Sequence, residues 1–132
     1  MLDRSQWDNA HETQRAVKRR LINWGWHYRG GGVNLGYPDH QPFTTPPARV
    51  QARPPEYIGQ DDADKVERLI TKGAQASLVG LRNLIILRTE YVTGHLTQES
   101  RAKSRGLSVR TYLRRVADAD FWFYCRSRGF DS

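Results

Sequence analysis

Apolar side chains recur with the period of an α-helix near the start of the chain. Between residues 14 and 28 they form one stripe of Val17, Leu21, Trp24 and Tyr28. This i, i+4, i+7, i+11 spacing places all four side chains on one face of a helix. Ile22 and Trp26 lie beside the stripe. We favour the interpretation that they widen the buried face; the alternative is that Trp26 contacts another protein.

Helical periodicity resumes after residue 60 in two successive stretches. Asp61, Asp62 and Asp64 open the first, where acidic side chains complement the positive end of a helix. Its apolar face consists of Val66, Leu69, Ile70 and Ala74. The second stretch begins near residue 78 and carries Leu78, Leu81, Leu84, Ile85, Ile86 and Leu87. Because it is apolar nearly all round, it is expected to be the central buried helix.

Residues 97–118 have the pattern of a helix, a tight turn and a second helix. Thr97 and Ser108 can each cap a helix with a hydroxyl group, and Gly106 can adopt a positive φ at no steric cost. The apolar face of the second helix consists of Val109, Leu113 and Val116, with Tyr112 beside them. A small residue at Ala102, then Gly106 and Ser108, is the spacing of a DNA-reading helix-turn-helix.

The second helix of this pair is expected to continue into four consecutive aromatics at residues 121–124. Neighbours on a helix point about 100° apart, so these four side chains cannot all face one core. We expect the N-terminal helix to cover the remainder. A second subunit or a larger protein partner is the alternative, with Trp122 as a candidate contact.

Residues 30–59 break the helical pattern. All six prolines of the chain lie there, after three consecutive glycines, which predicts an extended, irregular arm. The arm also carries spaced apolar side chains, Leu35, Tyr37, Phe43, Val50, Tyr57 and Ile58. A solvated spacer does not need them, so the arm is expected to lie against the helical body or a partner.

These patterns predict an all-α protein, a small helical bundle in three parts. Residues 1–29 form an aromatic amphipathic helix, residues 30–60 a Gly/Pro-rich arm, and residues 61–132 a helical body with the helix-turn-helix at 97–118.

Charge gives the helix-turn-helix its predicted partner. The chain has 21 lysines and arginines against 14 acidic residues, a net charge of +7. Within residues 97–115 the cations are Arg101, Lys103, Arg105, Arg110, Arg114 and Arg115, against Glu99 alone. A DNA duplex complements such a surface. The predicted DNA contacts are Arg101, Lys103, Arg105, Ser108, Arg110, Thr111, Arg114 and Arg115.

Arg101 and Arg105 occupy positions that usually carry core aliphatic residues. Either their stems lie along the core with the guanidinium groups outside, or the first helix is displaced. A basic helix pair that packs but reads no sequence is the competing interpretation.

Other chemistry is weakly represented. The single cysteine, Cys125, excludes an intrachain disulfide, and the four scattered histidines have no zinc spacing. Asp61, Asp62 and Asp64 are the only dense carboxylates, so a small Mg²⁺-dependent nuclease would have to use them, but their positions suit helix capping better. No apolar run of 18 residues and no secretory signal is present. We expect a cytoplasmic, non-enzymatic protein without catalytic residues, metal, cofactor or membrane contact.

Several short motifs resemble one known family. They are Leu21–Trp24-Gly25 with Trp26, Gly36-Tyr37-Pro38 before the proline-rich arm, an acidic helix start, LRNLIILRTEYVTGHLT, and the Gly-Leu-Ser turn. Over about residues 17–124 the chain resembles the phage late-gene antitermination protein Q family, in its short form without a zinc finger. The C-terminal part is also similar to the promoter-reading region of sigma factors.

The resemblance implies a bacterial RNA polymerase accessory factor. Such proteins bind DNA near a late promoter, load onto paused polymerase (with or without sigma factor) and allow readthrough of terminators. It implies that Ser108, Arg110, Thr111, Arg114 and Arg115 meet the major groove or its phosphates, with Lys103 and Arg105 on the backbone. Contacts to polymerase or a second subunit would then involve Trp24, Trp26, Tyr37, Phe43 and Trp122.

Two other functions fit the same residues. A dimeric helix-turn-helix repressor or sigma-like regulator would use the same helices, although it has little need of an irregular arm of about thirty residues. A protein-binding adaptor would use its positive charge only for solubility and would show no salt-dependent DNA binding.

Overall fold

The computed structural model describes residues 2–28, 58–93 and 97–130, and within these ranges all regular secondary structure is helical. The helices are α1 (Arg4–Asn9), α2 (His11–Tyr28), α4 (Gln60–Ala76), α5 (Leu78–Leu87), the π-helical segment η1 (Arg88–Val92), α6 (Gln98–Ser104) and α7 (Val109–Phe130). The predicted all-α class is confirmed. Nearly all of the predicted arm, including Tyr37 and Phe43, lies outside the described residues.

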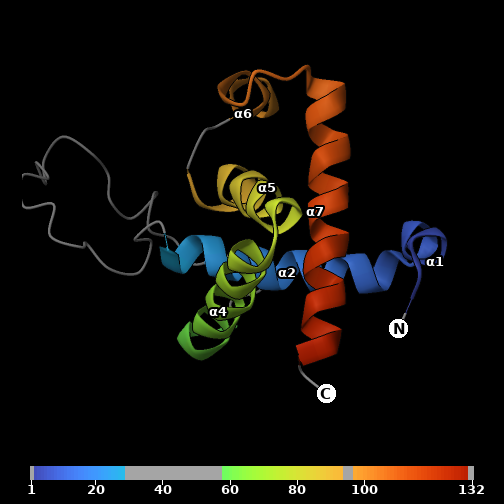
Figure 1. The fold of residues 1–132 in the computed structure, drawn as a ribbon, viewed down its shortest axis with the longest axis vertical. Coiled ribbons are helices and arrows are strands. Elements are labelled where there is room, and N and C mark those ends of the chain that lie inside the picture. The colour runs from blue at the N-terminus through green and yellow to red at the C-terminus, as the bar shows by residue number, and fades with distance from the viewer. Residues whose placement is uncertain (1, 29–57, 94–96, 131–132) are drawn as a thin grey trace, which may run out of the picture.

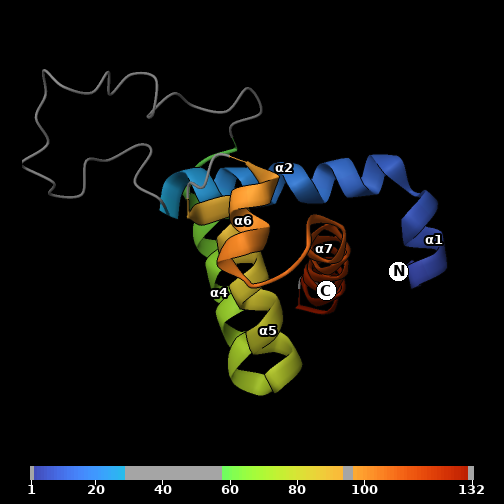
Figure 2. The same ribbon diagram turned by 90° about the horizontal axis from the view of Figure 1, so that it is seen from above.

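The two longest helices, α2 and α7, cross each other and organise the rest. In Figure 1, α7 stands upright and α2 passes across it, with α4 and α5 to one side and α1 to the other. Figure 2, a view along α7, shows the α4–α5 pair and α1 on its opposite flanks. Asn23, fully buried near the end of α2, ties α2 to the start of α4 by donating to the Gly59 carbonyl (2.8 Å).

The core forms where the apolar stripes of these helices meet. Helix α7 contributes Tyr112, Val116, Ala119 and Phe123, at the i, i+4, i+7, i+11 spacing of one face. The other helices contribute Val17, Leu21, Trp24, Val66, Ile70 and Leu87. Full burial of one large apolar side chain stabilises the fold by roughly 1.5–3 kcal/mol.

A buried polar cluster also joins α7 to the body. Asp120 is only 2% exposed; it accepts a hydrogen bond from Tyr91 Oη (3.0 Å) and pairs with Lys18 Nζ (2.7 Å). Burial raises the pKa of Asp120, while Lys18 and Tyr91 oppose that rise. The cluster therefore joins α2, η1 and α7 through one carboxylate.

The N-terminal part differs from the single predicted helix. A separate helix, α1, begins at a capping box in which Asp3 and Gln6 exchange hydrogen bonds. Its Trp7 is 3% exposed and its ring lies against Phe121 (5.7 Å between centroids) and Tyr124 (5.2 Å). Part of the aromatic run is therefore covered by α1, and not by the helix that was predicted over residues 14–28.

Helix α5 also differs from its prediction as the central buried helix. Leu78, Val79, Leu81 and Ile85 are 79%, 55%, 42% and 37% exposed. One side of α5 packs on α4 and another on α7, and no described residue covers the remaining side. Helix α7 in turn contacts α2, α4, α5 and α6, and its Phe121 and Tyr124 contact Trp7 of α1.

Candidate nucleic-acid interface

Local hydrogen bonds form the predicted helix-turn-helix. Thr97 Oγ1 accepts a hydrogen bond from the Ser100 amide (3.0 Å), and Ser108 Oγ accepts one from the Thr111 amide (3.2 Å). Both predicted caps are confirmed. Gly106 has φ +70°, the left-handed conformation that glycine adopts without strain.

The turn after α6 is a Schellman motif. The Leu107 amide donates to the Ala102 carbonyl and the Gly106 amide to the Lys103 carbonyl, each at 3.0 Å. Ala102 is 1% exposed, so its small side chain lets α6 lie close to its neighbours. The turn therefore sets the direction in which α7 leaves α6.

Glu90 of η1 links the helix-turn-helix to the helical segment that precedes it. Its Oε1 accepts a hydrogen bond from Tyr112 Oη of α7 (2.8 Å) and lies 2.9 Å from Arg101 Nε of α6. Burial raises the pKa of Tyr112, and the contact with Glu90 raises it further, so the phenol stays protonated as a donor at neutral pH. One carboxylate thus joins three helical elements, a role that the sequence analysis did not assign to Glu90.

The Glu90 contact explains why an arginine occupies an expected aliphatic position. The Arg101 side chain is 16% exposed and points inward to Glu90. We therefore leave Arg101 out of the outward basic surface, because its guanidinium group is engaged within the fold. Arg105, in contrast, is exposed at the end of α6. The sequence feature that could have indicated this ion pair is Glu90, a single glutamate within the largely apolar stretch that precedes α6.

The remaining predicted DNA contacts gather at one end of the molecule. Figure 1 shows α6 and the first turns of α7 together at the top, away from α4 and the C-terminal end of α7. Lys103, Arg105, Ser108, Arg110 and Arg114 are exposed there, and Thr111 and Arg115 are half-buried. We call Lys103, Arg105, Ser108, Arg110, Thr111, Arg114 and Arg115 the basic surface.

The basic residues of this surface differ from Arg101 in their ion pairing. Arg110 and Arg114 are four residues apart, on the side of α7 opposite its buried stripe. Arg115 is turned towards α5, where it lines a groove. In the part of the chain that the structure describes, none of the five basic residues of this surface forms an ion pair with a carboxylate. Their positive charge is therefore available to an external anion.

Two of the predicted polymerase or subunit contacts are buried inside the fold. Trp24 is 0% exposed and donates through Nε1 to Glu67 (3.0 Å), and Trp26 is 7% exposed. Gly25, between them, lets α2 approach the backbone of η1 closely. The structure removes these two residues from the surface candidates. Trp122 is half-buried in the groove between α5 and α7.

Two of the three aspartates at the start of α4 have side-chain partners in the fold. Asp62 pairs with Arg20 (2.9 Å), and Asp64 accepts a hydrogen bond from Tyr28 Oη (2.8 Å). Burial, followed by the contact with Asp64, raises the pKa of Tyr28 to about 12. Hydrogen bonds from Gln60 and Tyr28 lower the pKa of Asp64. Among the described residues, no group of three His, Cys, Asp or Glu side chains is placed to hold a metal ion.

No helix in the described ranges has the length and apolar character required to span a bilayer.

Comparison of the chain with family models, curated proteins and solved structures found no match.

Proposed function

We propose that this protein binds double-stranded DNA through the basic surface and acts, without catalysis, as a transcription antitermination factor. The observation that supports DNA binding is the pairing pattern of the arginines. Arg101 is held inside by Glu90, whereas Arg110 and Arg114 extend outward from α7 without a carboxylate partner in the described residues. A helix held in this way by a tight turn can enter the major groove.

The residues of the basic surface have different proposed roles. Ser108 and the first turn of α7 lie at the positive end of a helix, which favours a phosphate group. Arg110, Thr111 and Arg114 follow on α7 and can reach base edges or flanking phosphates. Lys103 and Arg105, on α6 and at its end, would contact the DNA backbone.

The antitermination role rests on the family resemblance of residues 17–124, and it adds a bacterial RNA polymerase partner. A dimeric repressor or sigma-like regulator would use the same basic surface without that requirement. A DNA mobility-shift assay on a paused transcription template, with and without polymerase, separates the two. The antitermination proposal expects polymerase to strengthen binding and purified protein to increase terminator readthrough. Tight binding that polymerase leaves unchanged, with no readthrough, would favour a repressor.

Arg110→Ala and Arg114→Ala should each weaken DNA binding. At least one should also change the preference between two DNA sequences by about 1–3 kcal/mol, as expected when an arginine contacts a base edge. Fluorescence anisotropy with both DNA sequences measures the change. Lys72→Ala, an exposed cation on α4 outside the basic surface, is the matched control and should leave affinity unchanged. Equal losses on both sequences would make the two arginines phosphate contacts only.

Lys103→Ala should act on salt dependence instead of sequence preference. Loss of one phosphate contact reduces the slope of log affinity against log salt by about one. Titrations at several salt concentrations measure that slope. If the slope stays at the wild-type value, Lys103 does not contact DNA.

A further inference from the structure

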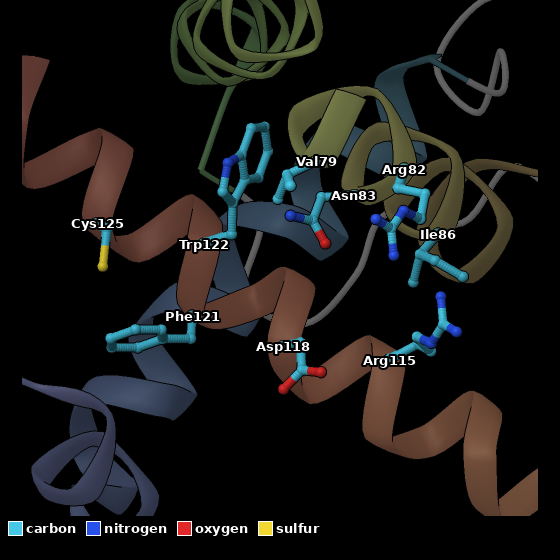
Figure 3. Close-up of a pocket in the computed structure, with 9 residues that line it drawn as sticks. All are labelled: Val79, Arg82, Asn83, Ile86, Arg115, Asp118, Phe121, Trp122 and Cys125. Atoms are coloured by element: carbon cyan, nitrogen blue, oxygen red, sulfur yellow. The ribbon is translucent and has the colours of Figure 1, made fainter. Parts of the chain in front are cut away.

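A groove between α5 and α7 lies beside the basic surface and has a different character. It has a volume of about 520 Å³. Val79, Arg82 and Ile86 of α5 form one wall, and Arg115, Asp118 and Trp122 of α7 form part of the other. Figure 3 shows the Trp122 ring beside Val79, and the guanidinium groups of Arg82 and Arg115 near Ile86. The groove is therefore apolar at one end and cationic at the other.

The apolar part of the groove continues onto the exposed side of α5. The groove-lining residues of α5 are Val79, Arg82 and Ile86. The residue before each of them in the chain is apolar, and these three side chains, Leu78, Leu81 and Ile85, form a neighbouring row on the helix. Leu78 is 79% exposed and Val79 55%. A contiguous exposed apolar surface beside a groove is typical of a protein-binding site.

Charge limits what can occupy the groove. Arg82 is exposed and Arg115 half-buried, and neither forms an ion pair with a carboxylate of the described residues. The carboxylate that lines the groove, Asp118, pairs with Arg4 of α1. The two arginines can therefore pair with acidic groups from outside the molecule.

The same charge disfavours a symmetric pair of this chain. In a two-fold contact the groove of one copy meets the same groove of the other, which brings the positive charge of Arg82 and Arg115 against an equal positive charge. DNA is disfavoured because the apolar row of α5 offers nothing to a phosphate backbone.

We propose that the groove binds an acidic amphipathic helix of another protein. Its apolar side chains contact Trp122, Val79 and the Leu78–Leu81–Ile85 row, and its acidic side chains pair with Arg82 and Arg115. Both walls present residues at i, i+3 and i+7, which are ridges that a third helix can pack against. This site shares Arg115 with the basic surface, whereas the proposed DNA contacts Arg110 and Arg114 do not line it.

The probe is a set of fluorescein-labelled synthetic helical peptides with leucines at i, i+3, i+4 and i+7, glutamates beside them, and the leucine register varied. Fluorescence anisotropy with the full chain is expected to show saturable binding of at least one peptide. The same peptide with lysine in place of glutamate is expected to bind about tenfold more weakly or not at all. Bound peptide should also slow alkylation of Cys125, the single cysteine, which lines the groove.

Two exposed positions of the groove give variants that do not depend on core packing. Arg82→Glu is expected to weaken binding about tenfold through charge reversal, and Val79→Ser several-fold through lost apolar contact. Arg114→Glu is the matched control, because it makes the same charge change outside the groove. It should impair DNA binding and lower peptide affinity much less than Arg82→Glu does, because Arg114 does not line the groove and its exposed charge is screened by salt.

Several results would overturn the proposal. The first is the absence of saturable binding by any peptide. The others are equal affinity for acidic and basic peptides, and equal effects of Arg82→Glu and Arg114→Glu on peptide affinity. Concentration-dependent dimers abolished by Leu81→Glu would assign the surface to a second copy. Peptide binding only after Leu35, Tyr37 and Phe43 are changed to serine would assign it to that segment of the same chain. If the wild-type chain binds the peptide but does not bind DNA, the proposed function is contradicted and the groove site stands.

Discussion

Gly25→Ala should destabilise the protein strongly, by about 3 kcal/mol or more, although it adds only one methyl group. A Cβ on Gly25 would overlap the carbonyl group of Tyr91, so α2 and η1 would have to move apart. The obstacle is backbone, which cannot rotate away as a side chain can. Trp24 and Trp26 are buried on either side of Gly25, so the shift would also disturb their packing.

The expected sign for Gly25 is opposite to that of an ordinary helical glycine. Glycine to alanine in a helix interior normally stabilises by about 1 kcal/mol. Gly129→Ala, in the last turn of α7, is the matched control, because no heavy atom lies within 4 Å of the added Cβ. Urea unfolding followed by far-UV circular dichroism measures both variants. Wild-type stability in Gly25→Ala would show that α2 and η1 do not cross at this residue.

Glu90→Ala should give the second large effect, a loss of about 2 kcal/mol. The substitution removes the carboxylate that pairs with Arg101 and the acceptor of the Tyr112 hydrogen bond, although both ends of the ion pair retain some exposure. We expect hydrogen exchange to rise first in α6, since Glu90 joins α6 to the body. DNA binding should weaken as well, because α7 would lose the support that orients it.

Two companion variants separate the ion pair from the hydrogen bond. Glu90→Gln keeps an acceptor for Tyr112 and should cost less than Glu90→Ala. Arg101→Met in the Glu90→Ala background removes the charge that has lost its carboxylate and should recover part of the stability, as a double-mutant cycle can measure. Glu99→Ala, on the exposed first turn of α6, is the control and should change stability by less than about 0.5 kcal/mol. Equal effects of Glu90→Ala and Glu99→Ala would contradict the proposed role of Glu90.

Where the sequence prediction agreed with the structure, the relevant interactions are local. Thr97 and Ser108 cap helices through bonds to residues three positions away, and Gly106 makes its turn within six residues. Helical periodicity likewise identified the buried stripe of α2 and the continuation of α7 past residue 118. Such features depend on near neighbours in the chain, whose spacing the sequence states directly.

The sequence by itself therefore determined the helical class, the helix-turn-helix and the positions of its cations. Only the tertiary structure decided which cations face outward, because Arg101 turns inward to a glutamate eleven positions earlier in the chain. It also decided that α1 covers Phe121 and Tyr124, and that one side of α5 stays uncovered by described residues. These outcomes depend on which elements lie side by side, and residues far apart in the chain set that arrangement through burial and charge pairing.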